Sequence, residues 1–181
     1  MMISGIALGG LTGTDATAIL ASGETIMPFL GQMGAGLALG LAALGSAIGI
    51  GKAGQAAAGA WAKEAKAGRN LNFTYIILLG MPISQTLYAM IVMNNMRPAV
   101  NDPATDLADA GLLLGIGLWT GLGEMASAWM QGLIGAAGIR GLSESEGKGF
   151  AFLIIAMGII ETVGIFTMVF MLGMIPELLA K

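Results

Sequence analysis

Cysteine and histidine are both absent from this chain of 181 residues. The first absence excludes a disulfide framework and thiol chemistry, and the second excludes zinc or haem sites built on imidazole. Charged residues are also scarce, at 10 % of the sequence, where a soluble domain carries roughly a quarter. The net charge of −3 gives no indication of nucleic-acid binding. Few side chains are therefore left to do chemistry, and each charge within an apolar stretch becomes significant.

Apolar residues fill the chain instead, at 56 % of the sequence with a mean hydropathy of +0.82. Four long apolar segments lie at approximately 29–62, 71–96, 104–141 and 152–172. About twenty apolar residues at ~1.5 Å each cross a bilayer core of ~30 Å. The sequence thus predicts an all-α membrane protein with four transmembrane helices.

The four segments repeat one plan twice: a glycine-rich segment, a polar loop and a bulkier segment. Ser46–Gly51 aligns with Ser127–Gly132, and such repeats indicate the architecture before any single motif does. Small residues four apart, which let helices approach closely, occur at Gly36/Gly40, Gly45/Gly49, Gly111/Gly115 and Gly117/Gly121. We therefore predict two tandem duplicated hairpins. In the bulkier segments the register places Ile83 opposite Glu161, so only the second copy has a carboxylate there.

This plan divides the chain into four parts. Residues 1–28 form an apolar leader, 29–97 the first transmembrane hairpin, 98–104 an outside connection and 105–181 the second hairpin. The leader lacks the positively charged start of a secretory signal, so we expect it to be retained, with cleavage near Ala21 as the alternative. Pro98, Pro103 and an Asn-Asp pair mark the connection, because these residues favour turns.

The basic residues predict the orientation in the membrane. Those in the two within-hairpin loops are Lys63, Lys66, Arg69, Arg140 and Lys148. The connection between the hairpins has one arginine and is followed by several aspartates. Because cytoplasmic loops carry an excess of lysine and arginine, we expect both hairpin loops in the cytoplasm and both termini outside the cell (inner) membrane.

Glu161 lies near the middle of the last apolar segment. An ionised carboxylate at that depth costs at least ~2.5 kcal/mol unless something compensates its charge. A residue of this kind is a functional hypothesis by default. We interpret Glu161 as the group on which an ion or a proton is carried. The competing interpretation is a structural carboxylate that is paired inside the bundle.

Polar groups on two other segments should lie near the depth of Glu161. Four residues of the second segment share one helix face, because they are spaced i, i+3, i+4 and i+7: Met81, Ser84, Gln85 and Tyr88. Pro82 can leave a backbone carbonyl free, and Gln131 lies about as far before its loop as Glu161 lies after it. These oxygens would suit an alkali cation. A proton carrier would need only the carboxylate and one hydrogen-bond partner.

Each of these polar groups also has a simpler interpretation. Gln85 and Gln131 can serve as interhelical hydrogen bonds, which polar side chains in membranes commonly form. Ser84 can bond back to its own helix. Tyr88 can be an aromatic residue on the outer face.

The motifs together resemble a known family. They are the duplicated hairpin, Pro82-x-Ser-Gln-x-x-Tyr88, Ala128-Trp-Met-Gln131-Gly, and Glu161-Thr162. From Phe29 to Leu172 the chain resembles the proteolipid (c or K) subunit of vacuolar-type ATPases, most of all the bacterial sodium-translocating branch. The resemblance implies a membrane ring of identical copies, glycine-rich helices inside, surrounded by lipids. The ring rotates against a stator subunit, and central-stalk subunits bind the cytoplasmic loops 63–70 and 140–148.

The resemblance also implies a site and a role. The sodium site would use the carbonyl of Met81 and the side chains of Ser84, Gln85, Gln131 and Glu161, with Tyr88 hydrogen-bonded to the carboxylate. The protein itself is not catalytic and needs no organic cofactor. Three departures from the family pattern are Ser84 where threonine is frequent, and Thr86 and Ala89 in place of glycines. None of them removes a ligand oxygen.

A rotor protein of this kind would carry Na⁺ or, alternatively, H⁺. Two other classes of protein remain possible on the sequence alone. A stand-alone secondary transporter also suits a duplicated hairpin, but that class favours inverted repeats and broken helices, whereas these repeats are parallel. A structural ring without a transported ion would leave the oxygens around Glu161 unexplained.

Glu124 is a second acidic residue at membrane depth, seven residues before Gln131 on the same helix face. Its repeat counterpart is Ala43, so it is not part of the duplicated plan. One interpretation is a neutral carboxyl that is hydrogen-bonded between the glycine-rich helices and serves only packing. The other is a relay or second site next to Glu161. The first predicts that transport is nearly unchanged in Glu124→Gln.

Overall fold

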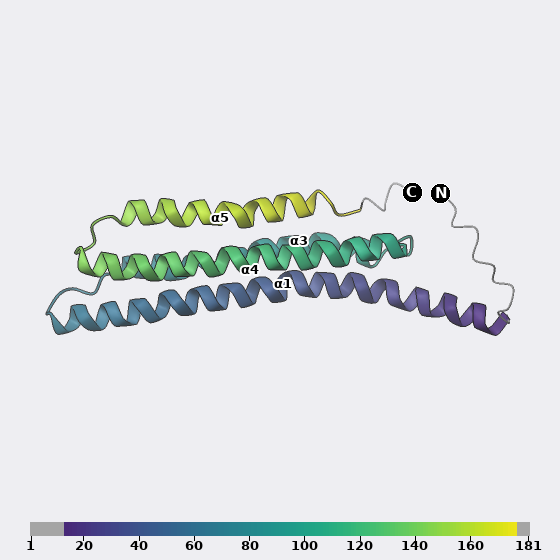
Figure 1. Ribbon diagram of the computed structural model, residues 1–181, viewed down its shortest axis with the longest axis horizontal. Coiled ribbons are helices and arrows are strands. Elements are labelled where there is room, and N and C mark those ends of the chain that lie inside the picture. The colour runs from purple at the N-terminus through teal and green to yellow at the C-terminus, as the bar shows by residue number, and fades with distance from the viewer. Residues whose placement is uncertain (1–12, 177–181) are drawn as a thin grey trace.

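The structure is a computed structural model that describes residues 13–176, with side-chain environments from residue 26 onward (Figure 1). Its elements are α1 (Gly13–Lys66), α2 (Thr74–Gly80), the short 3₁₀ turn η1 (Met81–Ile83), α3 (Ser84–Val100), α4 (Leu107–Glu144) and α5 (Phe150–Leu172). No strand occurs within residues 13–176, which confirms the all-α prediction for that part of the chain.

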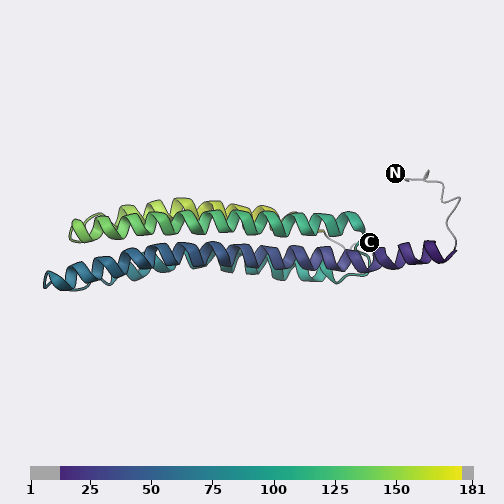
Figure 2. The same cartoon turned by 60° about the horizontal axis from the view of Figure 1, so that its bottom comes forward.

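The helices lie side by side as long antiparallel rods, with α2, η1 and α3 following one another as a single rod (Figures 1 and 2). Both within-hairpin loops are at one end of the bundle, and the connection between α3 and α4 is at the other (Figure 1). The chain therefore forms two hairpins, as the repeat predicts. Most of the predicted leader's first half, residues 1–12, lies outside the described residues.

The closest packing in the bundle is between the glycine-rich helices α1 and α4. A Cβ atom on Gly117 would collide with the backbone of Gly34, and one on Gly132 would collide with the backbone of Gly49. Only glycine permits this approach, as predicted for Gly45/Gly49 and Gly117/Gly121. The prediction is wrong within the chain for the other two pairs: a Cβ on Gly36, Gly40, Gly111 or Gly115 meets no atom within 4 Å.

In the part of the chain that the structure describes, three helical rods are long and apolar enough to cross a membrane: Ile26–Lys66, Thr74–Val100 and Phe150–Leu172, with mean hydropathies of 1.8, 1.8 and 2.2. The fourth predicted span, α4, is long enough but falls outside this set. Its polar side chains explain the difference, since Thr120, Glu124, Ser127 and Gln131 are all buried inside the bundle. These buried side chains lower the mean hydropathy of α4 although they do not face outward.

Two helix ends differ from the predicted boundaries. Helix α1 begins at Gly13 and continues through Pro28, so the second half of the predicted leader belongs to the same helix as the first predicted membrane segment. Helix α3 likewise continues through Pro98 to Val100, so the connection spans only 101–106. Asp106 then begins α4, where its carboxylate accepts a hydrogen bond from the backbone N–H of Asp109 at 2.9 Å.

Candidate ion-binding site

The second rod changes its helical geometry at Pro82, where the α-helix gives way to the single 3₁₀ turn Met81–Ile83. Proline lacks the backbone N–H that would donate to the carbonyl four residues earlier, so the α-helical ladder is interrupted here. The carbonyl oxygen of Met81 accepts a hydrogen bond from the backbone N–H of Ser84. The hydroxyl of Ser84 donates to the carbonyl oxygen of Met81 at 3.0 Å. The break therefore places a backbone oxygen and a hydroxyl next to each other at the start of α3.

Gln85 follows directly and is completely buried. Its Oε1 accepts a hydrogen bond from Ser84 at 3.1 Å, and its Nε2 donates to Ser127 Oγ at 3.1 Å and to Gln131 Oε1 at 3.2 Å. Both ends of the amide have hydrogen-bond partners, as is usual for a buried polar side chain. Gln85 thereby connects the start of α3 to the middle of α4.

Gln131 continues the network from α4 to α5. Its side chain is completely buried, and its Nε2 donates to the carbonyl oxygen of Met157 at 3.2 Å and to Glu161 Oε2 at 3.5 Å. The other carboxylate oxygen, Oε1 of Glu161, accepts from the hydroxyl of Tyr88 at 2.8 Å. Glu161 is thus held from both sides, by an amide of the second half and a phenol of the first.

The structure brings every residue predicted for the site into one hydrogen-bonded group, which includes Met81, Ser84, Gln85, Gln131, Glu161 and Tyr88. The oxygens it collects are a backbone carbonyl, a hydroxyl, two amide oxygens and a carboxylate. These are hard ligands that suit an alkali cation, and one carboxylate balances one positive charge. Cation binding by this set stays a prediction, and the structure supplies its geometry.

One member of the network was not predicted from the sequence. Ser127 Oγ accepts from Gln85 and donates to the carbonyl oxygen of Ile160 at 3.0 Å, so it links three helices. A signal was available: Ser127 lies four residues before Gln131, on the same helix face. Its repeat counterpart, Ser46, makes a matching contact in the first half, where it accepts from Thr86 at 2.8 Å.

Glu124 does not join this network. Its side chain is completely buried, and neither carboxylate oxygen has a hydrogen-bond partner among the described residues. The predicted hydrogen bond between the glycine-rich helices is therefore not formed. The carboxylate lies instead toward α5, where a Cβ on Gly164 would come within 2.5 Å of Glu124 Oε2.

At the loop end of the bundle, a second buried carboxylate holds the first hairpin loop in place. Glu64 accepts from the hydroxyl of Tyr75 at 2.5 Å and from the backbone N–H of Asn72 at 3.0 Å. Arg69 of the same loop donates to the carbonyl oxygen of Ser143 on α4 at 3.3 Å. The two loops that the sequence predicts to be cytoplasmic are therefore tied to each other.

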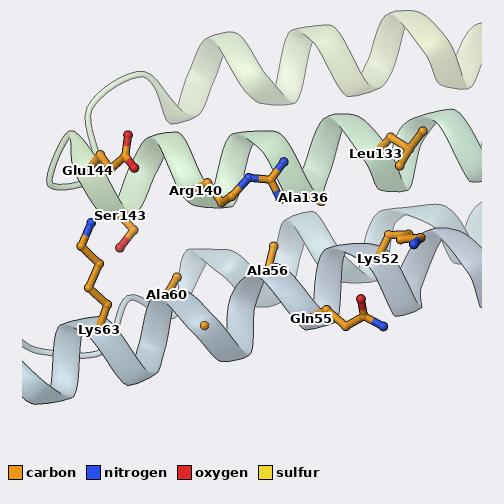
Figure 3. A pocket seen from close by; sticks show the side chains of 11 residues that line it. Lys52, Gln55, Ala56, Ala60, Lys63, Leu133, Ala136, Arg140, Ser143 and Glu144 are labelled. Carbon is orange, nitrogen blue, oxygen red and sulfur yellow. The ribbon is translucent and has the colours of Figure 1, made fainter.

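A pocket of ≈ 550 Å³ lies between α1 and α4 near the same end (Figure 3), and Glu161 is not among the residues that line it. Its charged lining residues are Lys52, Lys63, Arg140 and Glu144. The pocket therefore belongs to the basic loop end of the molecule and not to the ion-binding network.

The fold and the site together define a class: an all-helical proteolipid with apolar helices long enough to cross a membrane and a carboxylate hydrogen-bonded between them. The sequence model of the ATP synthase C-chain proteolipid family matches residues 33–94 and again residues 114–174. These two ranges make up well over half of the chain, which belongs to this family. One match in each half confirms the duplication. No curated protein matches the sequence well enough to be counted as a relative.

Membership of the family fixes the coarse role of the chain. Members of this family are non-catalytic, ion-translocating membrane components of the ATP synthase or ATPase rotor, and they assemble as rings of identical copies. The resemblance to a rotor proteolipid is therefore confirmed at the level of the family. Family membership implies that the chain forms part of a membrane ring of identical copies, which works together with other subunits of an ATP synthase or ATPase.

Proposed function

We propose that this chain is the rotor-ring proteolipid of a vacuolar-type ATPase and carries Na⁺ across the membrane on Glu161. The ring would turn against a stator subunit, driven by ATP hydrolysis in soluble subunits. One observation carries the proposal: Glu161 ends a chain of oxygen ligands drawn from both halves of the molecule. A carboxylate with this many oxygen-bearing neighbours can be charge-balanced by a cation inside a membrane.

Sodium is favoured over a proton by the chemistry of the neighbours. A proton on Glu161 needs one acceptor or donor beside it, and Tyr88 alone would supply that contact at 2.8 Å. The buried amides of Gln85 and Gln131 would then have no role in the transport step. An alkali cation uses amide, hydroxyl and carbonyl oxygens together. A proton-coupled rotor is the alternative reading of the same site.

The vacuolar-type assignment is supported by the unequal halves. Ile83, the counterpart of Glu161, is apolar and 55 % exposed, so each chain of four predicted membrane helices has one such carboxylate. A ring built from these chains carries fewer ions in each turn than an equal ring of two-helix subunits. A fixed free energy of ATP hydrolysis then works against a steeper gradient, which suits a pump.

The outer surface is consistent with lipid and with neighbouring copies. Helix α5 exposes large apolar side chains along its length, including Phe152, Ile159, Phe166 and Phe170. Glu161 itself is only partly buried within one chain, so a neighbouring copy in the ring would cover it further. The loops near 63–70 and 140–148 are proposed as the contact with central-stalk proteins, on the cytoplasmic side of the cell membrane.

The test uses a hydrophobic carbodiimide, which modifies a protonated carboxyl, on the detergent-purified ring. Na⁺ should protect Glu161 from modification at fixed pH, and Gln131→Ala should weaken that protection without preventing assembly. Gln55→Ala is the matched control, because it makes the same change at an exposed position of α1. Protection that follows pH but not Na⁺ would show that the ring carries protons.

A further inference from the structure

Among the buried polar side chains of α4 without a hydrogen-bond partner in the described residues, Glu124 and Thr120 are the two that are completely buried. Both carboxylate oxygens of Glu124 and the hydroxyl of Thr120 have no hydrogen bond among the described residues, and both side chains are completely buried. They are four residues apart, so they lie on the same face of the helix, one above the other. Buried polar groups without partners are rare and call for an explanation such as a missing ion or water.

Glycine at position 164 provides the space for this carboxylate. A Cβ there would lie 2.5 Å from Glu124 Oε2, and 3.3 Å from both Ser127 Oγ and Gln85 Cγ. The carboxylate of Glu124 therefore occupies the gap that Gly164 leaves, beside two members of the ion-binding network. Gly164 is three residues from Glu161, so this gap lies about one helical turn from the transport site.

The two halves differ at both positions that form this gap, and the two differences compensate each other in size. At the equivalent positions of the first half, Ala43 stands in place of Glu124 and Thr86 in place of Gly164. The hydroxyl of Thr86 is satisfied there by Ser46 at 2.8 Å. In the second half the side chain on one helix is larger and the side chain facing it is reduced to hydrogen. This exchange makes room for a carboxylate that the first half does not have.

The oxygens around this gap supply negative charge and no positive charge. Glu124, Thr120 and Ser127 offer a carboxylate and two hydroxyls, and no lysine or arginine is among the groups found next to them in the described part of the chain. An uncompensated carboxylate at membrane depth is strongly unfavourable. A cation held by the Glu161 site balances only Glu161. Glu124 must therefore be neutralised, either by a proton or by a cation of its own.

We propose that Glu124 forms a second binding position for a monovalent alkali cation, completed by the hydroxyls of Thr120 and Ser127. This position extends the proposed sodium site, on which it rests for the identity of the ion. Each chain then holds two cations, one at Glu161 and one at Glu124. Because Glu124 has no exposed surface while Glu161 is partly exposed, the second cation exchanges slowly and stays with the ring.

The test is the amount of Na⁺ bound by the detergent-purified ring, measured at saturation with radioactive Na⁺. The expected result is two Na⁺ per chain in the wild type and one in either Glu161→Gln or Glu124→Gln. Glu144→Gln is the matched control, since it makes the same change at an exposed position of α4 and should leave two. A wild-type value of one that stays at one in Glu124→Gln overturns the second position.

Two further variants keep the test informative if Glu124→Gln fails to assemble. Gly164→Ala fills the gap while keeping the carboxylate, and Thr120→Val removes the hydroxyl at nearly constant volume. Thr120→Val should lower the affinity of the slowly exchanging Na⁺ at least tenfold and leave the rapidly exchanging Na⁺ unchanged. Gly164→Ala should weaken the slowly exchanging Na⁺ more than the rapidly exchanging Na⁺, because its Cβ comes within 2.5 Å of Glu124 Oε2 and only within 3.3 Å of Gln85. Equal effects on both populations, or on neither, contradict the proposal.

The outcomes separate this inference from the proposed function. If Glu161 carries a proton, the wild type binds one Na⁺, which Glu124→Gln removes and Glu161→Gln does not. If Glu124 binds no cation, Glu161→Gln removes the single Na⁺ and Glu124→Gln has no effect. Absence of bound Na⁺ in the wild type overturns both.

Discussion

The two hairpins share one plan but contribute different parts to one site. The first supplies the proline break, Ser84, Gln85 and Tyr88, and has the apolar Ile83 where a carboxylate could be. The second supplies Gln131 and Glu161 on unbroken helices. Neither hairpin holds a complete set of ligands. The proposed site is therefore complete only when the two hairpins are packed together.

The largest effect is expected from removing the carboxylate of Glu161, whose counterpart in the first hairpin is Ile83. Glu161→Gln keeps the shape and hydrogen bonding of the side chain but removes the exchangeable charge, so ATP-driven transport should be abolished. The protein should remain inserted and assembled, as gel filtration of the solubilised ring would check. Glu144→Gln serves as the control for an acidic residue of the same half. Coupled transport that persists in Glu161→Gln would refute the central role of this residue.

The next largest effect is expected from breaking the hydrogen bond between the Gln85 and Gln131 side chains, which joins the two hairpins. Gln131→Ala removes one oxygen ligand and one of the partners of the buried Gln85. A buried group left unsatisfied costs about 1–3 kcal/mol, so Na⁺ affinity should fall about tenfold to hundredfold. Carbodiimide protection at graded Na⁺ concentrations measures this change. An affinity equal to that of Gln55→Ala would mean that the amide only joins helices.

A smaller effect is expected from the contribution of the first hairpin to the carboxylate. Tyr88→Phe removes the hydroxyl that donates to Glu161 at 2.8 Å and leaves the aromatic ring in place. A hydrogen bond to a charged group contributes about 1.5–3 kcal/mol, and the partial exposure of this pair favours the lower end, about tenfold in Na⁺ affinity. The same protection assay measures it. Unchanged affinity would show that Tyr88 is an outer-face aromatic without a role in the site.

The seam between the hairpins offers a test of packing alone. Gly132→Ala would push a Cβ into the backbone of Gly49, whereas Gly115→Ala on the same helix meets no atom within 4 Å. Overpacking of this kind costs typically about 1–3 kcal/mol. Thermal denaturation of the solubilised protein should therefore show a lower midpoint for Gly132→Ala than for Gly115→Ala. Equal midpoints would mean that the seam can widen without cost.

If Glu161 is the transport carboxylate of each chain, the unequal halves favour ion pumping over ATP synthesis. With one Glu161 per chain, the reconstituted complex should pump against steep gradients and synthesise ATP poorly at modest ones. Rates of ATP synthesis at a series of imposed Na⁺ gradients would measure this preference. Efficient synthesis at a modest gradient would contradict it.

Much of this arrangement could be predicted from the sequence, because apolar length, the repeat and the spacing of Ser84, Gln85 and Tyr88 are local properties. The boundaries at Pro28 and Pro98 could not, since a proline permits or ends a helix according to the packing around it. Ser127 was missed although it lies four residues before Gln131, because that spacing places it on the right helix face without showing which neighbouring helix it meets. The surroundings of Glu124 also escaped prediction, because the gap at Gly164 exists only once α4 and α5 are packed together.

The most direct test of the central claim is ATP-driven uptake of radioactive Na⁺ by the complete complex in proteoliposomes, with and without a protonophore. If Glu161 carries Na⁺, uptake should persist when the proton gradient is dissipated, and it should disappear in Glu161→Gln. Uptake that collapses with the protonophore, or that survives in Glu161→Gln, would contradict the account.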